Sequence, residues 1–386
     1  MTRVVFETAG IADVLKKVKA IAPSRGEGFD KAAGIVMRIF PATEDNFALV
    51  EATNLDLYYR EWVPVLECTA TEELVWRVAA KIADVIGSLP IGTGRTVELN
   101  DESKPGGRTL QIKSGRMKSS WQMIDPEYYP QWESFDPDEC TPIDNFGNRL
   151  AMVEWAAGDD TAHVFSGVNL DGEWAVATDS YRLSRVPLPI KAPWLNEGQS
   201  ITVPSKLLAQ LVKQTGTISV GATPSQLLVI PDPSVQIRTS LFANPWPSKG
   251  IAKLVATTHD GKLEAPKSPL VDLMNRAMVM LAGDRTPLLQ IYIGRGEIAV
   301  HAVDGETADL GDVLEVPGYA AHDRIRYLFT PKFIMEAIEK SPGDRIEWSY
   351  STSNVVSNVR ISDGGGYNCW VIPKQPQAAL QQEGES

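Results

Sequence analysis

The chain has 386 residues and a formal net charge of −12 at pH 7, with 43% hydrophobic and 22% charged residues. This composition is typical of a globular protein, and the length suits two or three domains that each bury a core. No apolar run approaches the ~20 residues of a membrane-spanning helix, and the N-terminus lacks a signal-peptide core, so we expect a cytoplasmic protein with no membrane partner.

The cysteines and histidines are too scattered to predict a metal or catalytic centre. The three cysteines form no CxxC pair, and the four histidines have no ligand spacing such as HExxH. The glycine-rich points match neither a P-loop nor a dinucleotide fingerprint. We therefore expect reduced thiols, no metal, no cofactor and no enzymatic activity.

In chain order, the first predicted helix spans 11–22. Ile11 and Val18 belong to its apolar face, and Lys16 and Lys19 lie on the opposite side. Alternating segments at 33–39, 47–52 and 55–65 predict the strands that follow it.

A second helix is predicted at about 77–87, with Arg77 and Lys81 turned outward. It is followed by strands at 97–99, 110–113 and 118–122, and Ser114-Gly115-Arg116 is expected to form the hairpin turn between the last two.

The same order of elements recurs twice. Helices are predicted at 148–157 and 204–214, and again at 267–281 and 331–341. Each third then has two helices and two sets of about four strands, so each third is itself a candidate doubled unit. We predict domains at 1–139, 140–260 and 261–374, followed by a polar, disordered tail at 375–386.

Two independent anchors support this repeat. The positions equivalent to the start of the second helix, Val78, Pro204 and Pro331, are 126 and 127 residues apart. The alanines that end three alternating strands, at 52, 177 and 302, are 125 residues apart both times. A period this long predicts three homologous α+β domains, whereas the simpler alternative is a chain of unrelated α+β domains with similar strands.

Charge is divided unevenly between the predicted helices and the rest of the chain. Within the six predicted ranges there are twelve Lys or Arg and six Asp or Glu, which leaves the remaining residues strongly acidic. On one helix, Lys206 and Lys213 are seven residues apart, on the face opposite Leu207 and Leu211. Any solvated helix face can collect lysines, but a net positive set of helices inside an acidic protein favours a basic surface that contacts phosphates.

Such a surface, without aromatic stacking groups or base-reading side chains, would hold DNA loosely and without sequence preference. The residues that we expect to contact DNA are Lys16, Lys17, Lys19, Arg77, Lys81, Arg149, Lys206, Lys213, Arg276 and Lys332.

Several short motifs carry a resemblance to a known family. Ala177-Thr178-Asp179-Ser180-Tyr181-Arg182-Leu183 is similar to the A-T-D-G-H-R-L of the bacterial DNA polymerase sliding clamp, the β subunit of the polymerase III holoenzyme. The order and spacing of further motifs extend the resemblance over residues 1–373. These motifs are Ser114-Gly115-Arg116, Val203-Pro204-Ser205-Lys206, Trp246-Pro247, Thr330-Pro331-Lys332 and Val371-Ile372-Pro373.

The resemblance implies an α+β fold of three repeated clamp domains, each with two helices packed on antiparallel sheets. It implies a head-to-tail homodimer that closes a ring around double-stranded DNA, with the helices inside. It also implies a processivity factor that tethers the replicative DNA polymerase and is opened by an ATP-driven clamp loader. The family's DNA-contacting loop arginine corresponds to Arg25, whereas His163 and Val164 replace the family's aromatic DNA contacts.

The resemblance further implies a groove that receives short peptides from polymerase, clamp loader and repair or ligase proteins. Its wall would consist of Phe165, Thr178, Ser180, Tyr181, Arg182, Leu183, Pro247, Ile251, Trp370, Val371, Ile372 and Pro373. Apolar and aromatic groups with one guanidinium suit Leu or Phe anchors of a partner. Ser180-Tyr181 replaces the family's Gly-His, and Lys374 replaces an apolar residue, so the preferred peptide is expected to differ.

Two other functions fit parts of the sequence. One is an enzyme with an active site in a cleft between the repeats, using a pair such as Asp179 and Arg182. The other is a sequence-specific DNA regulator, which the absence of helix-turn-helix and zinc motifs disfavours.

Overall fold

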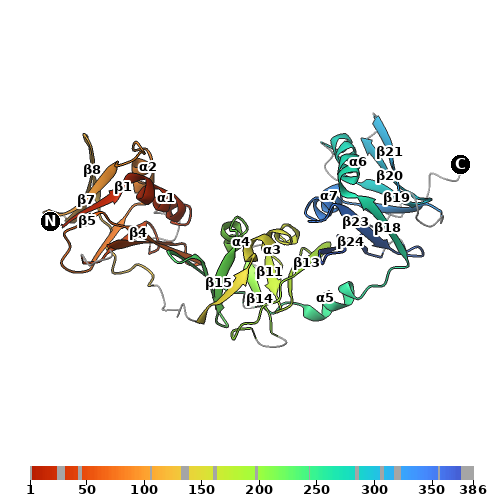
Figure 1. Ribbon diagram of the computed structural model, residues 1–386, viewed down its shortest axis with the longest axis horizontal. Coiled ribbons are helices and arrows are strands. Elements are labelled where there is room, and N and C mark those ends of the chain that lie inside the picture. Colours follow the sequence, from red (N-terminus) through yellow and green to blue (C-terminus); the bar gives the residue numbers. More distant parts are fainter. Residues whose placement is uncertain are drawn as a thin grey trace. The chain divides into compact units, whose positions relative to one another are not determined.

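The protein is described by a computed structural model, shown as a ribbon in Figure 1. It describes residues 2–23, 31–41, 46–104, 107–131, 139–159, 163–195, 199–242, 244–282, 287–304, 308–316, 323–354 and 357–374. The chain forms two compact units: Met1–Asp144 with Thr217–Leu241, and Asn145–Gly216 with Phe242–Ser386. The domain boundaries drawn from the sequence remain a prediction, and the predicted tail lies outside the described residues.

One supersecondary module recurs six times in the described residues: a strand that runs directly into a helix, followed by three further strands. The six strand–helix starts are β1 (Thr2–Glu7) with α1 (Thr8–Lys19), β6 (Leu74–Val78) with α2 (Ile82–Gly87), β10 (Thr141–Asp144) with α3 (Phe146–Ala151), β14 (Ile201–Pro204) with α4 (Ser205–Leu211), β18 (Gly261–Pro266) with α6 (Lys267–Met280), and β22 (Ile325–Phe329) with α7 (Pro331–Glu339). The doubled α+β unit expected in each third of the chain is therefore present.

The three strands after each helix complete the modules. In the first unit they are β2 (Ile35–Ile39), β3 (Phe47–Thr53) and β4 (Leu57–Pro64), then β7 (Thr96–Lys104), β8 (Gly107–Ser114) and β9 (Met117–Gln122), and also β15 (Thr217–Ala222), β16 (Gln226–Asp232) and β17 (Val235–Ser240). In the second unit they are β11 (Gly167–Leu170), β12 (Trp174–Thr178) and β13 (Arg182–Pro187), then β19 (Leu289–Gly294), β20 (Glu297–Asp304) and β21 (Ala308–Glu315), and finally β23 (Arg345–Tyr350), β24 (Val359–Ser362) and β25 (Asn368–Val371). Outside the modules lie a short strand β5 (Glu67–Cys68), a 3-10 turn at Glu154–Ala156 and helix α5 (Ser248–Val255).

The strands form four antiparallel sheets, two in each unit. The first unit has a five-stranded sheet in the order β5-β1-β7-β8-β9 and an eight-stranded sheet in the order β10-β15-β16-β17-β4-β3-β2-β6. The second unit has an eight-stranded sheet in the order β14-β11-β12-β13-β25-β24-β23-β18 and a four-stranded sheet in the order β21-β20-β19-β22. Each eight-stranded sheet joins two modules through their last strands, β17 with β4 and β13 with β25.

The helices form where apolar residues recur at helical spacing, and they pack against neighbouring helices and strands. Ile11, Leu15 and Val18 of α1 are fully buried, and α1 contacts α2, β3 and β4. Leu207 and Leu211 of α4 are likewise buried, as the spacing predicts. Helices α1 and α4 therefore bury their apolar faces and leave their polar faces outward.

The turn that follows β3 shows why particular residue types follow the alanine that marks the repeat. The Thr53 hydroxyl accepts a hydrogen bond from the Leu55 amide at 2.9 Å and donates one to the Leu57 carbonyl at 3.0 Å. The Asn54 side-chain oxygen accepts from the Leu57 amide at 2.8 Å. Leu55 has a φ of 77°, in the left-handed region that favours glycine.

The turn after β12 repeats this arrangement 125 residues later. The Thr178 hydroxyl accepts from the Ser180 amide at 3.1 Å and donates to the Arg182 carbonyl at 2.6 Å, and Asp179 accepts from the Arg182 amide at 3.0 Å. Ser180 has a φ of 76°. The two turns match bond for bond, and the corresponding turn in the last third of the chain includes positions 305–307, outside the described residues.

Several predicted helix ends are wrong. The sequence RVAAKIADVIG consists of good helix formers, but its first residues extend a strand, β6, that pairs with β2. The second helix therefore begins at Ile82, not at Arg77. The third and fourth helices end early, at Ala151 and Leu211. Helix α5 was not predicted.

Candidate nucleic-acid and peptide interfaces

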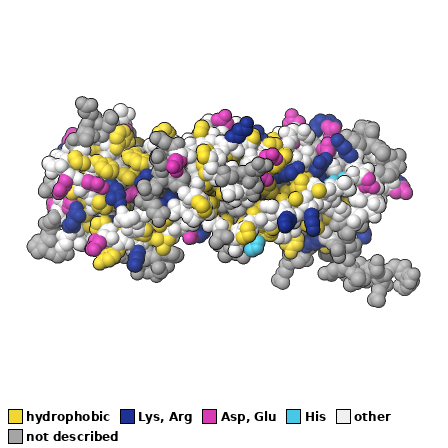
Figure 2. All heavy atoms as spheres, turned by 90° about the horizontal axis from the view of Figure 1, so that it is seen from below, with side chains coloured by type: hydrophobic (Ala, Val, Ile, Leu, Met, Phe, Trp, Pro, Cys, Tyr) yellow, Lys and Arg dark blue, Asp and Glu magenta, His cyan; other side chains and the backbone are white. Residues whose placement is uncertain are grey.

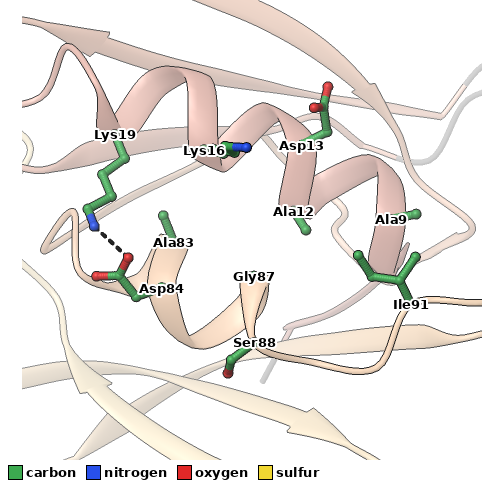
Figure 3. A pocket seen from close by; sticks show the side chains of 10 residues that line it. All are labelled: Ala9, Ala12, Asp13, Lys16, Lys19, Ala83, Asp84, Gly87, Ser88 and Ile91. Atoms are coloured by element: carbon green, nitrogen blue, oxygen red, sulfur yellow. Dashed lines mark hydrogen bonds and ion pairs between the residues drawn. The ribbon is translucent and has the colours of Figure 1, made fainter.

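Helices α1 and α2 lie side by side and enclose a hollow of about 630 Å³, shown in Figure 3. Lys16, Lys19 and Asp13 line it from α1, and Asp84 lines it from α2. The Lys19 ammonium is 2.5 Å from an Asp84 carboxylate oxygen, so one of the predicted DNA-contacting lysines is paired with a neighbouring helix. Lys16 is exposed at this hollow.

Other predicted DNA contacts are also paired with acidic side chains. Lys17 is 2.8 Å from Asp13 and 3.0 Å from Glu61. Arg276 is 2.5 Å from Asp312. The ion pair of Lys332 is longer: its ammonium is 3.8 Å from the nearest carboxylate oxygen of Glu336.

Lys16, Lys81 and Lys213 are exposed, and no ion pair is recorded for them within the described ranges. Lys206 is exposed on α4, whereas Arg149 on α3 is half-buried. Lys81 directly precedes α2 and Lys213 follows α4, so neither is inside a helix as predicted. Arg25 lies outside the described residues.

Arg77 is a correction to the predicted set, because its side chain is buried and structural. Only 3% of the residue is exposed. Its guanidinium donates hydrogen bonds to the carbonyls of Lys31 at 3.0 Å, Ala33 at 2.8 Å and Asp125 at 3.0 Å, and it lies 5.2 Å from the centroid of the Tyr129 ring. A strand position that points inward gives Arg77 no access to a phosphate.

The charge excess of the helices is smaller than predicted. Within their observed bounds, α1–α4, α6 and α7 contain eight Lys or Arg and five Asp or Glu. Figure 2 shows one face of the molecule, on which basic and acidic side chains are interspersed with hydrophobic ones. The helices therefore remain net positive, but their cations are partly neutralised by local ion pairs.

The second unit contains an apolar cluster at the predicted peptide groove. Its buried members are Val176, Leu183 and Trp370, on neighbouring strands of one sheet. Partly buried hydrophobic side chains pack against this floor: Trp174, Trp246, Ile251, Leu254 and Val255. Three of them belong to α5, a helix with no fully buried residue, so α5 is an amphipathic wall that leaves apolar surface accessible.

Beside this cluster lies a hollow of about 580 Å³ next to the β12–β13 turn. Tyr181 at its rim is 64% exposed and stacks on Phe333 of α7 with ring centroids 6.4 Å apart. Phe165 lies between the hollow and the cluster, because its ring is 4.7 Å from that of His163 and 5.5 Å from that of Trp246. We call the hollow and the adjacent apolar cluster, which Phe165 connects, the groove.

Arg182 also lines the hollow, but each of its three guanidinium nitrogens already has a partner. Its Nε atom donates to Asp179 at 2.9 Å, a terminal nitrogen donates to the carbonyl of Trp155 at 2.8 Å, and the other terminal nitrogen pairs with Glu336. The guanidinium carbon is 4.9 Å from the Trp155 ring centroid and 4.4 Å from that of Phe333. Arg182 therefore braces the groove, and a catalytic role for the Asp179–Arg182 pair is disfavoured.

The other predicted groove residues divide into accessible and buried ones. Thr178, Leu183, Trp370 and Val371 are at most 3% exposed, so they support the groove from below. The accessible positions are Phe165, Ser180, Tyr181, Pro247, Ile251 and Ile372, while Pro373 is buried. Ile372 is 38% exposed, and its amide donates to the Tyr181 carbonyl at 2.9 Å, which joins the end of β25 to the turn.

Sequence reasoning missed Trp174, Leu254 and Val255 of the apolar cluster, and Phe333 of the hollow. The alternation of β12 and the spacing of Ile251, Leu254 and Val255 are signals that could have identified the first three. Among the described residues, no cluster of His, Cys, Asp and Glu suited to a metal is found, and no helix is long and apolar enough to cross a membrane.

Comparison with solved structures identifies the fold. The DNA polymerase sliding clamp from Bacillus subtilis matches with a TM-score of 0.84 at 16% identity, covering 97% of this chain and 100% of that chain. The DNA polymerase III β subunit from Thermotoga maritima matches with a TM-score of 0.80 at 19% identity, covering 98% and 100%. The Helicobacter pylori β clamp bound to a DNA ligase peptide matches with a TM-score of 0.80 at 13% identity, covering 97% and 100%.

No protein-family model and no curated protein matches the sequence. At these low identities, the structural matches show that the chain has the sliding-clamp fold, which confirms the predicted α+β class with repeated domains.

Proposed function

We propose that this chain is a DNA polymerase processivity factor: a homodimeric ring that encircles duplex DNA without sequence preference and tethers the replicative polymerase through its groove. The protein would act by binding and not by catalysis, in the cytoplasm. The observation that carries the proposal is the pair of free last strands, β9 and β21.

The pairing rule of the two eight-stranded sheets predicts what these strands bind. In both sheets two modules meet through their last strands, and the first strand of a neighbouring module along the chain forms each outer edge. Strands β9 and β21 are the last strands of the two remaining modules, and each forms the edge of its own smaller sheet. If β9 of one copy pairs with β21 of a second copy, every module obeys the same rule and these exposed edges are removed.

Side chains on the two edges are complementary. Strand β9 carries Lys118 and no acidic residue, whereas β21 carries Asp312 and Glu315 and no basic residue. Val313 on β21 is 47% exposed, and Val279 on the adjacent helix α6 is 75% exposed. The exposed apolar side chains beside β21, and the opposite charges of β9 and β21, favour a head-to-tail interface between two copies.

Two such interfaces would close a ring of six domains from two copies of the predicted thirds 1–139, 140–260 and 261–374. Helices that face the bore would offer DNA the exposed cations Lys16, Lys81 and Lys213, with Lys19, Lys206, Arg276 and Lys332 available when their local interactions open. Such contacts are individually weak and depend strongly on salt, so the protein would slide.

The groove would receive peptides from the replicative polymerase, a clamp loader and repair or ligase proteins. The Helicobacter pylori clamp of the same fold has a DNA ligase peptide bound. In this chain the apolar cluster under α5 is suited to an aliphatic or aromatic anchor, and the hollow beside Tyr181 is suited to a second side chain.

The test is topological and uses the full chain. The protein is incubated with linear duplex DNA carrying biotin at both ends, the ends are then blocked with streptavidin, and the sample is washed at high salt. We expect retention, because salt removes phosphate contacts but not linkage through a ring. Cutting the duplex in its middle should then release the protein.

The control adds the protein after the ends have been blocked, which should prevent threading. Equal retention in the two orders of addition, or retention that persists after cutting, would refute the ring. Complete loss at high salt before cutting would also contradict it.

A further inference from the structure

The face of the eight-stranded sheet that forms the floor of the groove also holds an arginine that the proposed function does not use. Arg185 on β13 lies two residues after Leu183, so both side chains project from the same face of the sheet. The Arg185 guanidinium carbon is 4.1 Å from the centroid of the Trp174 ring and 5.0 Å from that of the Trp370 ring. Both tryptophans belong to the apolar cluster, so this cation lies beside the cluster.

Arg185 has no carboxylate partner among the residues that the structure describes. No ion pair or hydrogen bond of its side chain is recorded, and its Nε atom is buried without an acceptor. Asp171 interacts with it only at a distance, and the Asp171 carboxylate already accepts the amides of Glu173 and Trp174. A half-buried guanidinium without a hydrogen-bonded anion therefore lies close to two tryptophan rings.

A second arginine lies on the same sheet as Arg185. On β24 of the same sheet, Arg360 is directly opposite Trp370 in register. Its charge is balanced by Glu347, which Lys262 also contacts, at 2.7 and 2.6 Å. The Nε of Arg360 and the indole N–H of Trp370 are also buried without acceptors. Burial lowers the pKa of Arg185, the charge of Asp171 raises it, and the charge of Arg360 lowers it, so that burial prevails.

We propose that Arg185 binds a carboxylate of the partner peptide, next to the apolar anchor that occupies the groove. This inference depends on the proposed function and specifies the partner: an apolar anchor with an adjacent acidic group. The Trp174 and Trp370 rings lie beside the guanidinium, and no acceptor for its edge N–H groups is found among the described residues. That edge is the part that binds a carboxylate with two parallel hydrogen bonds.

A carboxylate fits this position better than an aliphatic or basic side chain. It would provide acceptors for a cation that otherwise has none, in surroundings where apolar rings strengthen the electrostatic attraction. The carboxylate could come from a Glu or Asp side chain or from the C-terminus of the partner. Both sources have the same chemistry, and the experiment separates them.

The test measures the binding of three fluorescent peptides to the full chain by anisotropy. All share a Leu-Phe anchor and a capped N-terminus. The first has Glu on both sides of the anchor and an amidated end, the second has Gln at these positions, and the third is the Gln peptide ending in a free carboxylate directly after the anchor. We expect the Glu peptide, the free-carboxylate peptide or both to bind at least about tenfold more tightly than the amidated Gln peptide.

Arg185→Gln should abolish this gain and leave the affinity for the amidated Gln peptide unchanged. Arg185→Lys keeps the charge without the planar fork and should keep only part of the gain. The matched control is Arg324→Gln, which makes the same change of charge at an arginine paired with Glu297 in another sheet. That variant should keep the full gain.

Equal affinity of all three peptides for the unmodified chain would overturn the inference, as would a gain that survives Arg185→Gln. If the Gln peptide binds but no carboxylate adds affinity, only the role of Arg185 fails. If no peptide binds, the groove assignment fails with it, whereas the end-blocking assay on DNA tests the ring separately.

Discussion

Replacing Arg182 by methionine tests whether the groove depends on the internal bonding of this arginine. Arg182 is 7% exposed and joins the β12–β13 turn to α7 and to the 3-10 turn at Glu154–Ala156. Methionine preserves much of the volume but removes all three hydrogen-bonded contacts. It leaves the Asp179 carboxylate, whose side chain is 15% exposed, without its cation, and the Glu336 carboxylate, 24% exposed, with only Lys332 at 3.8 Å.

Breaking a buried ion pair by removing one partner costs about 3–5 kcal/mol. Because the carboxylates of Asp179 and Glu336 still reach some water, we expect a value near the lower end, about 3 kcal/mol. The measurement is chemical denaturation of the full chain followed by tryptophan fluorescence, with Trp155 as a local reporter.

A second variant separates the role of charge from that of volume. Adding Glu336→Gln to Arg182→Met removes one stranded carboxylate, so the double variant should be less destabilised than the sum of the two single variants, by about 1–3 kcal/mol. A cost below about 1 kcal/mol for Arg182→Met, or strict additivity, would show that the arginine is not an internal brace. In that case it would be available to bind partners directly.

Three further predictions follow from single features. Leu55→Gly and Ser180→Gly should each stabilise the chain by about 0.5–1 kcal/mol in denaturant titrations, because relief of left-handed strain exceeds the added freedom of the unfolded chain; destabilisation by either change would contradict the turn geometry. Val313→Glu adds a like charge beside Asp312 and Glu315 on β21, so the mass in solution should fall from twice 42.2 kDa to 42.2 kDa; an unchanged dimer would exclude this edge. Hydrogen bonds from Asn100 and then Arg3 lower the pKa of Glu98 to about 2. The stabilisation that the Glu98 carboxylate gives the folded chain is therefore present above the unfolded pKa of about 4.3 and is lost as pH falls through about 2. Glu98→Gln should therefore flatten the acid dependence of unfolding between these values, and an unchanged acid profile would refute this role.

The fold could be predicted because its signals are local and repeated. The Thr-Asn/Asp turn after β3 and β12 recurs at a fixed period, since its side-chain hydrogen bonds require those residue types. The helices could be predicted from their apolar faces. Their ends could not, because the segment around Arg77 has helix-forming residues but is held in a strand by pairing with β2, a contact that lies far away in sequence.

The groove could be located from the family motif, but the contacts that its residues make could not be predicted. The motif placed Arg182 at the site, whereas its partner Glu336 is 154 residues away and no sequence pattern joins the two. Helix α5 was missed because its short apolar stripe follows a Trp-Pro pair. Ion pairs such as Lys19 with Asp84 were missed because no sequence pattern joins the two residues. The helices therefore proved less basic in effect than their composition indicated.

The most direct test of the central claim is an electron-microscopy image of the full chain in solution. The account predicts class averages of a closed ring with a central hole wide enough for duplex DNA, formed by two copies that meet through β9 and β21. Particles of a single copy, or of two copies without a central opening, would contradict it.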